Sequence, residues 1–242
     1  MRGPLFLVAL AACAAPVQQA APAAQAPPTS LILPAVPYAC DLRAVPVGTW
    51  AEYQRKVPGV NVMTEKVAAV SRGPDGITIE TSPWRDFVTA LLLDPGTRGE
   101  GRLKRITFQD GAYDPMDNPI DEKRQHFYRS LDGQTPVGEE TVTVRAGTFR
   151  TKRYRYKTAW DETVDVWIDA AVWPLCVVKL EAELKQGWPD GNRFDYELTA
   201  TGTGATAQIT RPAIPYDSEA LKKRGEAQRA ATMPRESAGE RR

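Results

Sequence analysis

Few side chains in this chain have the chemistry that catalysis needs. His126 is the only histidine, so a Ser-His-Asp or Cys-His hydrolase would have to act through it, with Ser130 one helical turn away. The chain contains no Gly-x-Ser-x-Gly nucleophile elbow. We therefore interpret His126 as a surface residue and predict that the protein is not an enzyme. An exported hydrolase is the least favoured of three functions.

Two groups of acidic side chains could instead bind a cation or act as an acid–base pair. The first is Asp114, Asp117, Asn118 and Asp121, and the second is Asp161, Glu162, Asp165 and Asp169. Prolines break the calcium-loop spacing of the first group, and Asp165 and Asp169 fall on the polar side of a predicted strand. One histidine and distant cysteines are too few ligands for zinc. We predict no metal, no cofactor and no catalytic residues.

The N-terminus has the pattern of an export signal that ends at Cys13. Residues 1–12 contain one positive charge, a short apolar run and small residues, as a secretory signal peptide does. The run Leu10-Ala11-Ala12-Cys13 also resembles the bacterial lipobox, which predicts that Cys13 is acylated and anchors the mature chain in a membrane. An ordinary signal peptide with a cysteine beside its cut site is the alternative. Ala14 is not the Asp of inner-membrane retention in enteric bacteria, which favours the outer membrane.

Composition divides the rest of the chain into three parts. Residues 13–46 are the predicted lipidated cysteine and a disordered tether rich in Ala and Pro. Residues 47–210 are long enough for one domain with a sizeable core. Residues 211–242 form a charged tail that we expect to be mostly mobile. Lys and Arg total 31 against 30 Asp and Glu, which argues against nucleic acid as a partner.

Export would place Cys40 and Cys176 in an oxidising compartment, where two cysteines can pair. Cys40 comes shortly before the first predicted strand, and Cys176 falls on the apolar face of a later one. The sequence does not bring their Cα atoms within bridging distance. A disulfide and two separate buried cysteines therefore both remain open.

Alternation of apolar and polar residues dominates the chain between 47 and 204. In 141–183 it places Val164, Val166 and Ile168 opposite the charged residues, which is typical of an antiparallel sheet with one apolar face. Gly147 marks a tight turn between two of these strands. The predicted fold class is mainly β: a curved antiparallel sheet, or open half-barrel, with one or two short helices.

Three segments could be helical. The apolar residues of 84–93 fit a helix face as well as a strand, and we predict a strand because short strands flank them. A short helix is predicted to begin at Asp121 and carry Phe127 and Leu131. A further helix over 217–231 is interrupted by glycine and has few apolar anchors.

Aromatic and basic residues supply the candidate binding surfaces. Trp50, Tyr53, Trp167 and Trp173 are candidates for lining an apolar cleft. Trp167 is out of phase with its apolar neighbours, so it lines a second apolar surface or is covered by another segment. Arg150, Lys152, Arg153, Arg155 and Lys157 alternate with Tyr154 and Tyr156, a pattern that suits lipid head groups or a solvated edge strand protected by its charges.

Four stretches carry a resemblance to a known group. They are Val144-Arg145-Ala146-Gly147-Thr148-Phe149, Tyr154-Arg155, Thr163-Val164-Asp165-Val166-Trp167-Ile168 and Trp173-Pro174-Leu175-Cys176-Val177-Val178-Lys179-Leu180. Together they resemble the strand-turn-strand core of bacterial envelope proteins related to the LolA/LolB-like half-barrel group, mainly over 47–204. The resemblance implies an open, strongly curved sheet whose concave face holds a helix or an acyl chain, and it implies no catalytic residues. Members often have Gly where Cys176 stands.

The predicted function follows from the anchor and this resemblance. We expect a lipid-anchored, periplasm-facing protein that binds an acyl chain, a lipid or a lipoprotein in a hydrophobic cleft. The alternative is a structural or docking lipoprotein of the cell envelope whose cleft is filled by its own chain. The ligand, the protein partner and the oligomeric state are left open.

Overall fold

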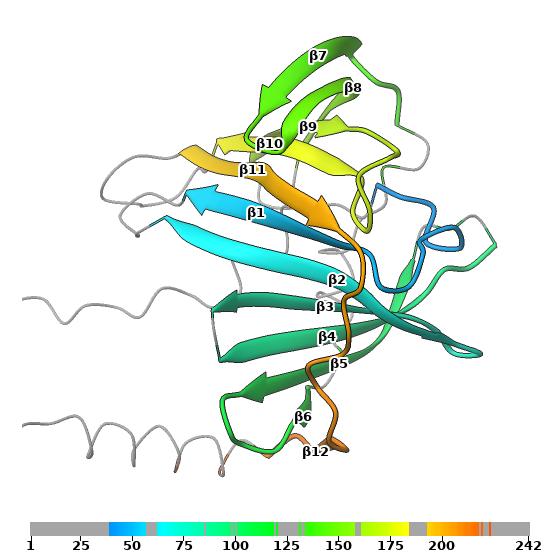
Figure 1. Cartoon of the computed structure of the whole chain (residues 1–242), viewed down its shortest axis with the longest axis vertical. Coiled ribbons are helices and arrows are strands. Elements are labelled where there is room, and N and C mark those ends of the chain that lie inside the picture. The colour runs from blue at the N-terminus through cyan, green and yellow to red at the C-terminus, as the bar shows by residue number, and fades with distance from the viewer. Residues whose placement is uncertain are drawn as a thin grey trace, which may run out of the picture.

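The computed structural model describes residues 39–56, 62–84, 86–97, 99, 101–118, 120, 131, 134–157, 161–183, 193–217, 219 and 223. Its elements are strands (Figure 1). They are β1 (Trp50–Lys56), β2 (Met63–Gly73), β3 (Gly76–Trp84), β4 (Phe87–Asp94), β5 (Arg102–Asp110), β6 (Met116–Asn118), β7 (Gly138–Val144), β8 (Gly147–Lys157), β9 (Thr163–Ile168), β10 (Val177–Glu183), β11 (Arg193–Gly202) and β12 (Ile214–Pro215). The helix predicted from Asp121 and most of the helix predicted over 217–231 lie outside the described residues.

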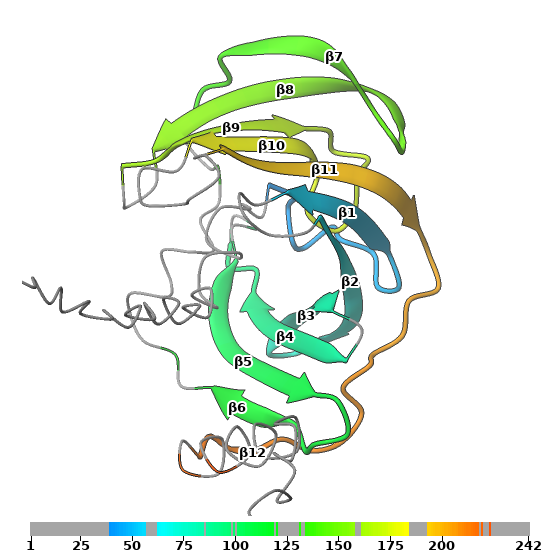
Figure 2. The ribbon, with the colours of Figure 1, turned by 90° about the vertical axis from the view of Figure 1, so that its left-hand side faces the viewer.

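All of these strands belong to one 12-stranded sheet, in the order β12-β6-β5-β4-β3-β2-β1-β11-β10-β9-β8-β7. Neighbouring strands are antiparallel except for β12, which pairs with β6 in parallel. The sheet curls strongly without closing, because its edge strands β7 and β12 lie at opposite ends of the molecule (Figures 1 and 2). The predicted class, a mainly β open half-barrel, is confirmed.

Strand alternation gives the sheet an inner, concave face that is apolar. In β1, Ala51 and Tyr53 are buried while Glu52 and Gln54 are partly exposed, and β9 buries Val164 and Val166 in the same way. Register shifts interrupt several ladders, for example between Glu52 and Tyr53, and such bulges increase the local twist of a strand. The prediction of a sheet with one apolar face is therefore correct for strands such as β1 and β9.

Strand β4 is buried on both faces, which explains why its sequence fits either a helix or a strand. Leu91 and Leu93 face inward, while Val88 and Ala90 face outward and are also buried. The outward side is covered by residues 203–215, which we call the strap. Glu80, the cross-strand neighbour of Ala90, accepts hydrogen bonds from two backbone amides of the strap. The prediction of a strand over 84–93 is correct, with a turn separating β3 from β4.

The strap continues the fold beyond the expected domain boundary at 210. It leaves β11, crosses the outer face of β2–β5 and ends in β12 beside β6 (Figure 1). Arg211 bonds the Asp114 carboxylate at 2.7 Å and donates to the carbonyls of Ala112 and Tyr113. The expectation that the charged tail begins at 211 is therefore wrong by at least five residues, because β12 pairs through backbone bonds that no side-chain pattern reveals.

The packed part also begins earlier than Val47. Residues 39–49, which we call the closing segment, run across one end of the half-barrel and bury Cys40, Leu42 and Val45. The amide of Leu42 bonds the carbonyl of Gly99 at 3.1 Å, and Arg72 Nη2 donates to the carbonyls of Leu42 and Val45. Residues 39–46, which the sequence analysis assigned to the tether, therefore belong to the packed domain, since Leu42 fills space that only the folded sheet creates.

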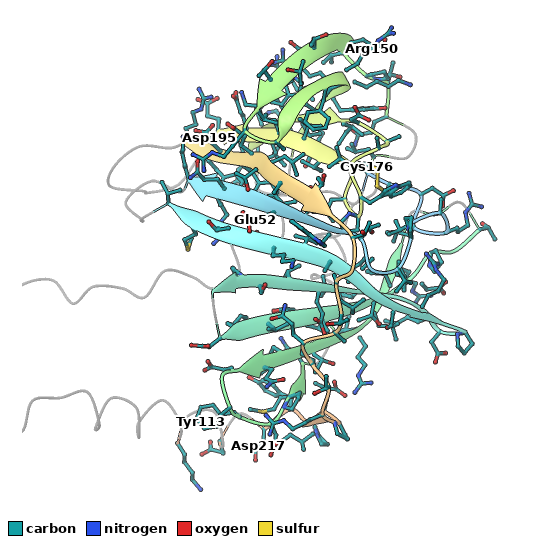
Figure 3. All side chains as sticks on the ribbon, in the orientation of Figure 1. Glu52, Tyr113, Arg150, Cys176, Asp195 and Asp217 are labelled. Atoms are coloured by element: carbon teal, nitrogen blue, oxygen red, sulfur yellow. A yellow bond between two sulfur atoms is a disulfide. The ribbon has the colours of Figure 1, made fainter. Side chains whose placement is uncertain are left out.

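A disulfide fixes the closing segment to the other half of the sheet. Cys40 and Cys176 form an S–S bond with their Cα atoms 5.2 Å apart, which resolves the two alternatives that the sequence left open. The amide of Ala39 also bonds the carbonyl of Leu175 at 3.1 Å. Figure 3 shows this bridge at the end of the strands opposite Asp195.

Candidate functional site

The inner face carries two charged side chains among its apolar ones. On β1, Arg55 lies between Met63 of β2 and Tyr196 of β11, which are its cross-strand partners. Glu65 of β2 is the partner of Tyr53 in the same way. Alternation therefore places all five side chains on the inner face. Arg55 is completely buried and Glu65 is 3% exposed.

The Arg55 guanidinium is poorly satisfied. Its Nη1 lies 3.6 Å from Glu65 Oε2, which is an ion pair longer than a hydrogen bond, and its Nη2 donates to the Met63 sulfur at 3.5 Å. Among the described residues, neither Nε nor Nη1 has a hydrogen-bond partner. A thioether is a weak acceptor, so this cation is held with little of the hydrogen bonding that its five N–H groups can make.

Burial moves both charges of this pair toward their neutral forms. Burial lowers the pKa of Arg55, and the negative charge of Glu65 offsets part of that change. Burial likewise raises the pKa of Glu65, against the charge of Arg55 and a hydrogen bond from Tyr196. The two groups therefore stabilise each other only incompletely, as expected for a buried pair at 3.6 Å.

Two tyrosines form a rigid support beside the pair. The rings of Tyr53 and Tyr196 stack with centroids 4.3 Å apart, and the Tyr53 hydroxyl donates to the carbonyl of Val177 at 2.9 Å. Burial raises the pKa of both phenols, so both stay neutral. Tyr53 is thus on the concave face, where the sequence analysis placed a cleft residue.

The site residues predicted from the sequence do not include Arg55, Glu65 or Tyr196. A signal was present, because Arg55 is in phase with the buried Ala51 and Tyr53, and Glu65 is in phase with Val67 and Ala69. A charged residue at an inward position is rarely buried without a partner. Chemically, the arrangement provides a fixed, desolvated cation that suits an oxyanion.

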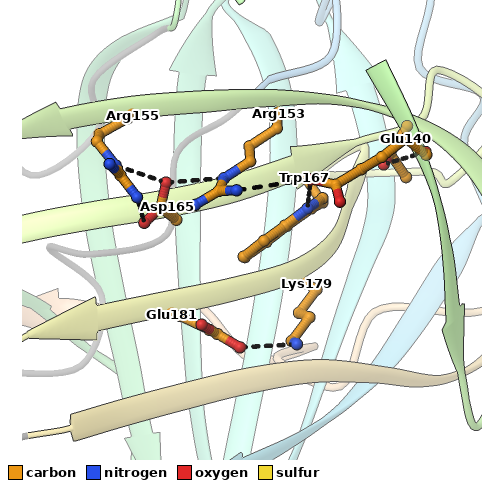
Figure 4. Close-up of polar contacts among 8 residues, drawn as sticks. Glu140, Arg153, Arg155, Asp165, Trp167, Lys179 and Glu181 are labelled. Carbon is orange, nitrogen blue, oxygen red and sulfur yellow. Dashed lines mark hydrogen bonds and ion pairs between the residues drawn. The ribbon is translucent and has the colours of Figure 1, made fainter. Parts of the chain in front are cut away.

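Trp167 belongs to a different surface. It lies on the outer face of β9, where its indole N–H donates to Glu140 Oε1 at 2.7 Å (Figure 4). The Arg153 guanidinium and the Lys179 ammonium each lie 5.1 Å from its ring. These side chains leave Trp167 only 6% exposed, so it is a covered residue and does not line a groove mouth.

The remaining cleft candidates also lie apart. Trp50 is on the outer face, where its indole N–H donates to the carbonyl of Thr203 and Lys66 lies 4.6 Å from its ring. Trp173 is half-buried in the loop that carries Cys176 and packs against the core. The structure therefore does not bring the cleft candidates Trp50, Tyr53, Trp167 and Trp173 together on one surface, because adjacent positions of a strand point to opposite faces.

The acidic candidates are paired with cations or backbone amides. Asp165 receives hydrogen bonds from Arg153 and Arg155 (Figure 4), and Asp117 from Arg105 and Thr107. Asp114 pairs with Arg211, and Asp169 accepts from the amide of Ala171. The described residues contain no cluster of three or more metal-ligating side chains. Cys13, Asp121, His126 and Ser130 lie outside the described residues.

The basic strand is β8, and it is not an edge. It lies between β7 and β9, with Arg150 bonded to Glu139, and Arg153 and Arg155 bonded to Asp165. Most of its positive charge is thus matched by neighbouring strands, which favours a solvated face over a head-group surface.

The outer face also has one shallow hollow of about 210 Å³, over β1, β10 and β11. Its lining is Gln54, Lys56, Lys179, Glu181, Arg193, Asp195, Tyr196 and Glu197. The cations and carboxylates there pair with each other, as Arg193 does with Glu181 and Asp195. This hollow has neither net charge nor an apolar floor that would select a ligand.

Comparisons with known proteins give little further guidance. No protein-family model and no curated protein matches the chain. Two solved structures of MucB in complex with MucA, one of them from Pseudomonas aeruginosa, are 14% and 12% identical to this chain, with TM-scores of 0.34 and 0.33. The alignments cover 72% and 68% of this chain but only 55% of each MucB chain. Similarity at this level does not establish a shared function. Within the described residues, no helix is long and apolar enough to span a membrane.

Proposed function

We propose that this protein is an exported envelope lipoprotein that binds the acyl chain of a lipid or a lipoprotein against the inner face of its half-barrel. The observation that carries this proposal is the shape of the sheet. It is open, apolar on its inside and closed at one end by a segment held by the Cys40–Cys176 bridge. Burying an apolar guest there is favourable by about 25 cal/mol per Å², before the cost of ordering it.

The anchor and the location are part of the same proposal. Acylated Cys13 would hold the domain at the periplasmic side of a membrane, the outer membrane in preference to the inner one, because Ala14 and not Asp follows the cysteine. The proposed role is binding without catalysis. Replacing Cys13 by Ser should remove the acyl mass and release the chain into the soluble periplasmic fraction.

Native mass spectrometry of the full chain carrying Cys13→Ser tests the binding role. We expect adducts of lipid or fatty acid mass in protein purified from a bacterial periplasm without detergent. Ala182→Leu adds bulk at a buried inner position and should reduce the adducts, whereas Glu183→Leu adds the same side chain at the exposed neighbouring position and should leave them unchanged. Protein that carries only Cys13→Ser and is ligand-free under gentle conditions would contradict the proposal.

A docking protein with a filled inner face is the second candidate. It is favoured by the complete burial of inward side chains such as Tyr53, Leu91 and Leu180, which is what a face packed by protein shows. The ligand-free spectrum would support it. Crosslinking in intact cells would then identify the partner, and a lipid adduct on the protein that carries only Cys13→Ser would count against this candidate.

A further inference from the structure

The unsatisfied Arg55 guanidinium is the feature of the described residues that a purely structural role explains least. Buried polar groups in proteins are almost always hydrogen-bonded. Arg55 is a rare exception, because it is completely buried and two of its guanidinium nitrogens have no hydrogen-bond partner. Every other arginine discussed above bonds a carboxylate or a carbonyl oxygen.

Stability alone does not account for this residue. Replacing a buried ion pair by apolar side chains of similar size is commonly neutral or stabilising, because the pair loses its hydration when it is buried. Arg55 and Glu65 are 3.6 Å apart and so recover little of that loss. Residues that break such packing rules occur mainly where a function requires them.

The position of Arg55 suits the head of an amphiphile. It is the second-last residue of β1 and lies at the end of the strand away from the disulfide, beside Tyr196, whose neighbour Asp195 marks that end (Figure 3). From there toward the disulfide, the inner face continues through Tyr53 and Ala51, which are both completely buried. A guest with its head at Arg55 would therefore place its chain along apolar side chains.

We propose that Arg55 binds the anionic head, a carboxylate or a phosphate, of the amphiphile on the inner face. This inference rests on the proposed acyl-chain binding and names the chemistry of its ligand. The planar guanidinium offers two parallel N–H groups that match two oxygens of such a head. Burial shifts Glu65 toward its neutral form, although Arg55 and Tyr196 oppose that shift, so Glu65 repels an incoming anion less than an exposed glutamate would.

Calorimetric titration of the full chain with Cys13→Ser tests the inference with four probes. These are dodecanoate, dodecyl phosphate, dodecanol and inorganic phosphate. We expect at least one charged amphiphile to bind about tenfold or more tightly than dodecanol, the increment of a charge-assisted hydrogen-bonded pair. The stronger of the two charged amphiphiles identifies the head group. Binding of inorganic phosphate as tight as that of the amphiphiles would overturn the lipid head as the ligand.

Three variants separate a binding role from a folding role. Arg55→Met should remove the preference for the charged amphiphiles while dodecanol still binds. Met63→Glu keeps Arg55 but places a carboxylate at its half-buried cross-strand partner, where it can pair with the guanidinium. This variant should therefore also lose the preference for charged amphiphiles, and its melting temperature should rise. Thr64→Glu adds the same charge at the exposed adjacent position and should change neither the preference for charged amphiphiles nor the melting temperature.

The outcomes distinguish this inference from the proposed function. If all three amphiphiles bind with equal affinity to the chain that carries only Cys13→Ser, the head-group role of Arg55 is wrong while acyl-chain binding stands. If none binds, acyl-chain binding itself fails and the inference fails with it. A preference for charged probes that persists in Met63→Glu would place the anion elsewhere and would overturn the role of Arg55.

Discussion

Two ion pairs of this protein differ in what they contribute, although both join an arginine to a carboxylate. Arg153 and Asp165 lie on the outer face at 3.0 Å and are partly exposed, where such pairs contribute about 0–1 kcal/mol. Arg55 and Glu65 are buried at 3.6 Å, where the loss of hydration exceeds the attraction. The inner pair is therefore retained at the expense of stability.

Removing only one partner of the Arg55–Glu65 pair should destabilise the protein more than removing both partners. Glu65→Leu leaves the Arg55 charge buried alone and should lower the free energy of unfolding by about 3–5 kcal/mol. The double variant Arg55→Met with Glu65→Leu should be at least as stable as the wild type. Urea unfolding measures both, and a double variant as unstable as Glu65→Leu would contradict this account.

Asp165 should give the protein part of its acid sensitivity. Burial raises its pKa, but hydrogen bonds from Arg155 and Arg153 outweigh that effect, so the pKa lies below the ordinary 3.8. The unfolded chain then binds the proton more readily, and the contribution of Asp165 is present above about pH 4 and lost as the pH falls through its lower folded value. Unfolding free energies between pH 2.5 and 6 should fall less steeply on acidification in Asp165→Asn.

At the scale of elements, one buried side chain holds the middle of the strap. Glu80 is 2% exposed, and its two oxygens accept from the amides of Gln208 and Ile209 at 2.8 and 3.1 Å. Glu80→Ala should cost about 1–3 kcal/mol of stability, because those amides lose charged acceptors. Hydrogen exchange at 208 and 209 should speed up most. Glu183→Ala at an exposed position is the control, and equal effects of the two would contradict the role of Glu80.

The disulfide should stabilise the fold mainly by restricting the unfolded chain. It joins residues 136 positions apart, so the closed loop contains β1 to β9. Replacing Cys40 and Cys176 by Ala should lower the free energy of unfolding by about 2–5 kcal/mol. Wild-type protein in reducing agent should match the variant, and an unchanged unfolding midpoint after reduction would contradict the prediction.

At the scale of the whole molecule, the sheet could be predicted because its signal is local. Val164 and Val166 alternate with charged residues, and Gly147 turns the chain at φ 143° where the sequence places a turn. The strap and the closing segment could not be predicted in this way. Leu42 and the Glu80 carboxylate gain their environment from residues that are distant in sequence, and no local period records such contacts.

The site was harder to predict than the sheet for a related reason. Periodicity assigns Trp50 and Trp167 to the outer face, yet their size suggested a cleft. Arg55 follows the inward phase of its strand, but its charge suggested exposure. In both cases residue type and strand position conflicted, and position was the better guide.

The disulfide between Cys40 and Cys176 also determines how the domain responds to a mechanical pull. Tension applied through the chain before Ala39 enters the fold at Cys40 and passes across the sulfur atoms into the loop before β10. The first strand and its buried arginine are thereby shielded from the load. With the bridge reduced, the same pull would run along the closing segment and peel β1 from its neighbours first. The interior of the domain would therefore stay intact under such a pull only while that bond is oxidised.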